Sequence, residues 1–120
     1  MDKVITICEW YDGPVLGLAT CSDELVVYVR VFSEENDEWT NEYELLSVSD
    51  SDISVMLDEW QLWVDSIYHR TKYDYSLKLY INEIVENKTD YKRKRKYARF
   101  WGSFDKGYIP RNYYVEWSDK

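Results

Sequence analysis

Leu25-Val26-Val27-Tyr28-Val29-Arg30-Val31-Phe32 decides the fold, because β-branched and aromatic residues fill almost every position of this stretch. A run of this composition with polar residues on either side predicts a β-strand. Two earlier stretches, Val4–Tyr11 and Leu16–Cys21, have the same character and are separated by the turn residues 12–14. The first third of the chain therefore predicts three antiparallel strands in a meander.

The remaining sequence predicts two helices between early and late strands. Ser49 offers an N-cap hydroxyl, and the apolar residues after it recur at spacings of four and three, which predicts an amphipathic helix of about 18 residues. A second helical pattern is formed by Leu77, Ile81, Ile84, Val85 and Lys88. Residues 43–48 predict a fourth strand or an extended lead-in, and residues 97–104 and 113–117 predict the last two strands.

These elements together predict an α+β fold, with an antiparallel sheet of four to six strands and two helices packed on one face. The chain has 120 residues, of which 45% are apolar, and this is enough for one small core. We therefore expect a single domain over residues 1–120. The 21 residues of Trp, Tyr and Phe are either core filler or contact surface, since tyrosine and tryptophan serve both purposes.

The sequence has no signal-peptide pattern, and no apolar run approaches the roughly 18 residues of a membrane span. We expect a cytoplasmic protein that does not contact a membrane. Cys8 and Cys21 would then be reduced, as two small buried hydrophobic residues, although they could also face each other across the first hairpin.

The net charge of −8 divides unevenly along the chain. Residues 1–66 hold 16 acidic residues against only Lys3 and Arg30, a net charge of −14, whereas residues 67–120 have a net charge of +6. The sequence is therefore an electrical dipole. A sheet built from strands of both halves would blend the two signs.

No catalytic apparatus is recognisable, so we expect neither an enzyme nor a bound cofactor or metal. His69 is the only histidine, and its position at the end of a helix favours a capping or surface role. Cys8 and Cys21 are too far apart for a zinc or redox motif, and the four glycines form no nucleotide-binding pattern. A carboxylate-dependent hydrolase is the weakest of the alternatives, because the carboxylates have no distinguishing spacing.

Two charged segments are candidate binding sites. The first is the acidic loop over residues 33–42, where an aromatic anchor accompanies the charges, and its predicted contact residues are Glu34, Glu35, Asp37, Glu38 and Trp39. The second is a basic run followed by aromatic residues, which would suit nucleic acid; it consists of Lys92, Arg93, Lys94, Arg95, Lys96, Arg99 and Trp101. The net negative charge opposes a polyanion, and the run could instead pair with the acidic half of the chain.

The segment Glu9-Trp10-Tyr11-Asp12-Gly13-Pro14, with Gly17 three positions on, resembles a small group of uncharacterised bacterial proteins that open with a strand, a Tyr-Asp-Gly-Pro turn and a second strand. Leu57, Trp60 and Trp63 resemble the later helix of that group, and Val115-Glu116-Trp117 resembles its end. Size and acidity also resemble those of immunity proteins of bacterial toxin systems, and this resemblance implies a non-enzymatic protein with an acidic surface.

The leading hypothesis is therefore an immunity or antitoxin type of protein that binds a basic partner, such as a toxin domain, through the acidic loop. The alternative is a nucleic-acid-associated protein that uses residues 92–99 and Trp101. The oligomeric state is open in both.

Overall fold

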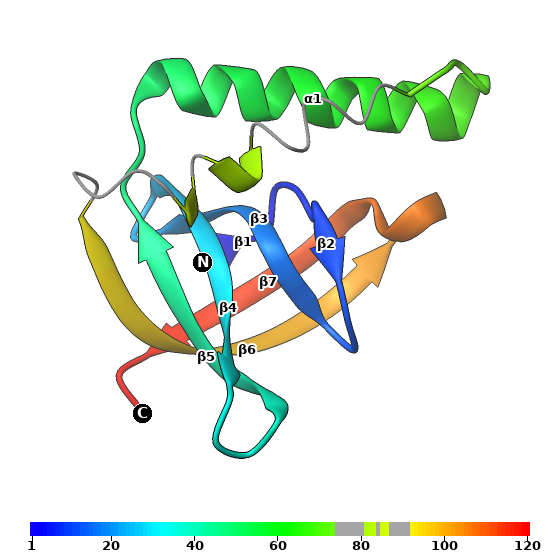
Figure 1. Ribbon diagram of the computed structural model, residues 1–120. Helices are drawn as coiled ribbons and strands as arrows, with labels where there is room; N and C mark the ends of the chain where they lie inside the picture. The colour runs from blue at the N-terminus through cyan, green and yellow to red at the C-terminus, as the bar shows by residue number, and fades with distance from the viewer. Residues whose placement is uncertain (74–80, 84, 87–91) are drawn as a thin grey trace. The chain divides into compact units, whose positions relative to one another are not determined.

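The computed structural model describes residues 1–73, 81–83, 85–86 and 92–120 (Figure 1). The chain forms two compact units, one made of residues 1–47 and 92–120 and the other of residues 48–91. The first unit holds the sheet, and the second holds the long helix. The single domain over residues 1–120 stays a prediction.

The first unit is a seven-stranded antiparallel sheet that curves into a half-barrel (Figure 1). Its strand order is β1-β7-β6-β5-β4-β3-β2. The strands are β1 (Asp2–Lys3), β2 (Glu9–Trp10), β3 (Pro14–Cys21), β4 (Glu24–Ser33), β5 (Glu38–Leu46), β6 (Arg93–Phe104) and β7 (Pro110–Ser118). A 3-10 turn, η1 (Lys106–Tyr108), joins β6 to β7.

The N-terminal segment supplies the strands at both ends of this order, β1 at one end and β2 at the other. β1 pairs with β7, and a few residues later the chain turns to β3. There the backbone N–H of Ile5 donates to the carbonyl of Leu18 at 2.8 Å, and that of Cys8 donates to the carbonyl of Leu16 at 2.7 Å. Of the single strand predicted over Val4–Tyr11, only Glu9–Trp10 forms a strand, β2, whereas β1 precedes the predicted range.

Aromatic rings form much of the core of the sheet. The ring of Tyr43 lies 5.9 Å from that of Tyr28, 5.5 Å from that of Phe100 and 5.7 Å from that of Trp117, measured between centroids and all near edge-to-face. This geometry suits the quadrupoles of the rings. A good part of the aromatic content is therefore core, as one of the two interpretations of the composition expected.

Two buried tyrosine hydroxyls bind backbone carbonyls, and one of them requires a glycine beside it. The hydroxyl of Tyr28 donates to the carbonyl of Thr6 at 2.7 Å, and that of Tyr43 donates to the carbonyl of Pro14. A Cβ on Gly17 would lie 2.2 Å from the oxygen of Thr6 and 2.6 Å from the hydroxyl of Tyr28. Only a glycine allows this close approach of strand, ring and carbonyl.

The second unit contains α1 (Asp50–His69), a helix of 20 residues. The side chain of Ser49 accepts a hydrogen bond from the backbone N–H of Asp52 at 3.3 Å, so the predicted N-cap is confirmed. Asp50 and Asp52 lie in the first turn, where negative charge is favourable. No helix in the part of the chain that the structure describes is long and apolar enough to cross a membrane.

The prediction of four to six strands with two helices packed on one face is wrong. The structure has seven strands, because the short strand β1 precedes the first predicted strand and adds to the sheet, and its described residues contain one long helix. Residues 81–83 and 85–86 of the second predicted helix are helical, whereas Leu77, Ile84 and Lys88 lie outside the described residues.

Candidate functional site

The hairpin of β4 and β5 ends in a short acidic turn. The two strands pair as far as Ser33 and Glu38, which leaves residues 34–37 as the turn. The backbone N–H of Asn36 donates to the Oγ of Ser33 at 3.3 Å, and Asp37 has a φ of 52°, a conformation that aspartate tolerates in turns. The predicted loop over residues 33–42 is therefore too long, because β5 already begins at Glu38.

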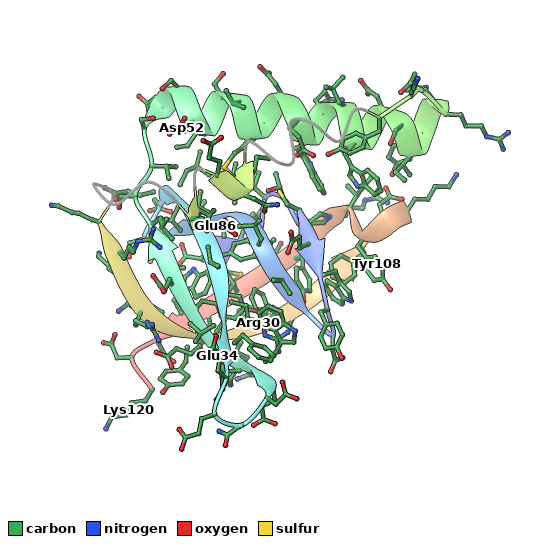
Figure 2. The ribbon with its side chains drawn as sticks, in the orientation of Figure 1. Arg30, Glu34, Asp52, Glu86, Tyr108 and Lys120 are labelled. Carbon is green, nitrogen blue, oxygen red and sulfur yellow. The ribbon has the colours of Figure 1, made fainter. Side chains whose placement is uncertain are left out.

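The predicted contact residues lie together at this turn. Glu34, Glu35, Asp37 and Glu38 are all exposed, and Trp39 is half-buried. Figure 2 shows Glu34 at the hairpin, where side chains spread away from the strands. Among the described residues, none of these four carboxylates takes part in an ion pair. The turn, together with Glu38 at the start of β5, therefore presents four uncompensated negative charges.

Three partly exposed aromatic rings adjoin the acidic turn. The ring of Trp39 lies 5.1 Å from that of Phe32, in an edge-on arrangement, and 6.4 Å from that of Tyr11, measured between centroids. Phe32 is 39% exposed and Tyr11 is 63% exposed. Together the three rings and the four carboxylates of residues 34, 35, 37 and 38 form the hairpin surface.

Sequence reasoning missed two of the three rings. Phe32 and Trp39 are register partners across the hairpin, so a four-residue turn would have placed them opposite each other. Tyr11 comes from the turn after β2, and no sequence signal links it to Trp39.

Arg30 holds the turn after β2 against the hairpin. Its Nη1 donates to the carbonyl of Tyr11 at 2.8 Å, and its Nε donates to the carbonyl of Thr40 at 2.5 Å. The hydroxyl of Thr40 in turn donates to the carbonyl of Val31 at 2.8 Å and accepts from the backbone N–H of Glu42 at 3.1 Å. Hydrogen bonds from a charged donor are among the stronger ones, so the backbone at Tyr11 and at Thr40, beside the three rings, is held in place.

The basic run lies within the sheet and is partly neutralised there. β6 begins at Arg93, so the run is part of the strand and does not lead into it as expected. Arg93 pairs with Glu44 at 3.2 Å, and Arg95 pairs with Glu42 at 3.1 Å and with Glu44 at 3.6 Å. The alternative interpretation, in which the run pairs with the acidic half of the chain, therefore holds for these two arginines.

Lys96 is also paired, at the other edge of the strand. Its Nζ lies 2.5 Å from a carboxylate oxygen of Asp119, and this hydrogen bond raises the pKa of Lys96 and lowers the pKa of Asp119. Within the described residues, Lys92, Lys94 and Arg99 take part in no ion pair. The predicted nucleic-acid site is thus interrupted, because alternate residues of a strand point to opposite faces and three of its cations are engaged.

The other candidate chemistry stays dispersed. His69 is the last residue of α1 and is exposed, and Cys8 and Cys21 are half-buried and form no disulfide with each other. A search of the described residues found no group of three or more His, Cys, Asp or Glu side chains that could hold a metal ion.

Comparison of the chain with protein-family models, with curated proteins and with solved structures gave no match. The geometry of the hairpin surface is therefore the basis of the function proposed below.

Proposed function

We propose that this chain is a non-enzymatic protein-binding module of immunity or antitoxin type, which neutralises a basic partner protein through the hairpin surface. The observation that carries the proposal is the combination of four uncompensated carboxylates with the rings of Phe32 and Trp39 on one hairpin, against which Arg30 holds the turn that carries Tyr11. Carboxylates speed the encounter with a basic surface, and aromatic side chains supply contact area in the bound complex. The carboxylates thus suit the encounter with the partner, and the aromatic rings suit the bound complex.

The chemistry of the hairpin surface favours a partner face rich in Arg and Lys. A guanidinium or ammonium group can lie on the exposed part of the Trp39 or Phe32 ring while it remains close to the carboxylates of the turn. A toxin domain that binds a polyanionic substrate has such a face. We place the protein in the cytoplasm, a reducing environment that suits two cysteines without a disulfide.

The experiment is a binding and neutralisation assay against toxin domains encoded beside the gene. We expect one domain to bind the protein and to lose its activity in the complex. Replacing Trp39 by Ala should weaken binding about 30-fold or more, because loss of an interface hot spot costs about 2 kcal/mol or more. Glu24→Lys serves as the control, since Glu24 is an exposed acidic residue at the opposite end of β4.

Two results would contradict the proposal. One is the absence of any toxin-like gene beside this one. The other is a complex whose affinity is changed by Glu24→Lys and left intact by Trp39→Ala, because the partner would then dock elsewhere.

A further inference from the structure

The outer face of β6, β7 and β1 carries a row of aromatic and cationic side chains. Tyr97, Arg99 and Trp101 occupy alternate positions of β6, and the neighbouring strands add Tyr114 and Lys3. Tyr97 is 39% exposed and Trp101 is 40% exposed. These five residues form the sheet strip, which shares no residue with the hairpin surface.

Register places the sheet strip on one face. Trp101 pairs with Tyr114, and Tyr114 pairs with Lys3, so the three side chains follow one another across three strands. The rings of Trp101 and Tyr114 are stacked, with centroids 5.9 Å apart, and the Nζ of Lys3 lies 5.6 Å from the ring centroid of Tyr114. Core residues such as Phe100 belong to the opposite face.

The cations of the sheet strip differ from the rest of the basic run. Arg93 and Arg95 are engaged by carboxylates of β5, whereas Arg99 is exposed and, among the described residues, in no ion pair, although Glu116 lies opposite it in the register. Arg99 also lies between the two exposed rings, about 6.6 Å from each along the strand. The sheet strip is thus an alternation of ring, cation and ring.

We propose that the sheet strip binds single-stranded nucleic acid, with bases stacked on Trp101 and Tyr97 and with phosphates at Arg99 and Lys3. Stacking on exposed rings between cationic side chains is the chemistry by which sheet surfaces hold unpaired bases. A duplex hides its base faces, so this surface has little to offer it beyond two cations. The proposal differs from a site formed by the whole basic run, because the cations at residues 93, 95 and 96 are already paired.

The net charge of −8 does not exclude this interaction. At physiological ionic strength the screening length is about 8 Å, so charges further away than that contribute little to binding at the strip. Glu42 and Glu44 on β5 are compensated by their ion pairs with Arg93 and Arg95 on β6. Binding is then governed by Arg99 and Lys3 together with the exposed Glu116 opposite Arg99, and it is expected to be weak and salt-dependent.

The test is a titration of a labelled, mixed-sequence RNA of about 12 nucleotides, a length within the range of a single stacking site. We expect binding at low salt, with log K falling against log salt at a slope of about −1.4 for two phosphate contacts on a single strand. Arg99→Gln should reduce the slope to about −0.7. Trp101→Ala should weaken binding at least about 5-fold, and Trp101→Phe, which keeps a stacking ring, should retain most of it.

Controls separate stacking from simple attraction between charges. Polyglutamate and a DNA duplex of the same length should bind far more weakly than the single strand, because neither offers unstacked bases. Equal binding of either probe, or no RNA binding at low salt, would overturn the proposal. Loss of RNA binding in Trp39→Ala with no effect of Trp101→Ala would overturn it as well, since RNA would then bind the hairpin surface.

Discussion

At the scale of single residues, Tyr28 and Tyr43 connect the core of the sheet to the backbone of Thr6 and Pro14. Burial raises the pKa of Tyr28 well above 10.0, and electrostatic interactions with Cys8 and Tyr43 raise it further. Burial also raises the pKa of Tyr43, against an opposing effect of Arg30. Both hydroxyls therefore stay protonated and donate to backbone carbonyls over the whole neutral range.

These raised pKa values predict a loss of stability at alkaline pH. In the unfolded chain both tyrosines ionise near pH 10, whereas in the folded protein they ionise only above it, so the full stability is present below pH 10 and declines as the pH rises further. Urea unfolding measured from pH 7 to pH 12 should show this decline.

The variant Tyr28→Phe separates the two roles of the hydroxyl. At pH 7 it should be less stable than the wild type by about 1–3 kcal/mol, because the buried carbonyl of Thr6 loses its donor. Above pH 10 its stability should fall less steeply, since one titrating group has been removed. An unchanged slope in this range would refute the assignment of the alkaline transition to Tyr28.

Sequence reasoning succeeded for residues whose chemistry decides their exposure. Charged Glu34 and Glu35 have no place in a core, and both are exposed. It failed for Tyr11 and Phe32, because exposure of an aromatic residue depends on which strand lies opposite and where that strand ends. For Arg95 the sequence left pairing with the acidic half as one of two alternatives, because its ion pair with Glu42 depends on the β5–β6 register.

At the scale of elements, the β4–β5 hairpin is the structure on which the proposed function rests. Its loop projects beyond the neighbouring strands (Figure 1). The Arg30 side chain binds both the hairpin, at Thr40, and the turn after β2, at Tyr11. The hairpin surface should therefore depend on this guanidinium.

Arg30→Lys tests this dependence. A lysine keeps the charge but cannot bind two separate carbonyls with a planar fork, so we expect a loss of about 1–3 kcal/mol in the free energy of unfolding. Amide hydrogen exchange should accelerate in residues 38–41 while β3 stays protected. Uniform acceleration over the whole sheet would instead mean that Arg30 supports the core in general.

The predictability of the elements follows the apolar content of their residues. β4 and α1 were predicted within one or two residues at each end, because their patterns reflect burial on a definite face. The first half of β5 lies within the loop predicted over residues 33–42, because polar residues such as Thr40 and Asn41 carry no apolar pattern. The change of partner between β1 and β2 could not be predicted, since alternation does not reveal which strand lies alongside.

At the scale of the whole molecule, ion pairs between strands cancel part of the charge division seen in the sequence. β5 from the acidic half pairs with β6 from the basic half, so their charges compensate each other across the strands. The acidic turn at residues 34–38 has no such neighbour in the described chain and keeps its charge. The acidic turn is therefore one part of the acidic surface that remains, and it is the part whose position coincides with exposed rings.

The most direct test of the hairpin surface is the rate at which the partner toxin domain associates with it, measured by stopped flow at several salt concentrations. We predict that the double variant Glu34→Lys and Glu35→Lys associates about tenfold or more slowly than the wild type at low salt and loses most of the salt dependence, because electrostatic steering is gone. Glu24→Lys should leave both nearly unchanged. A double variant with the association rate and salt dependence of the wild type would contradict the account.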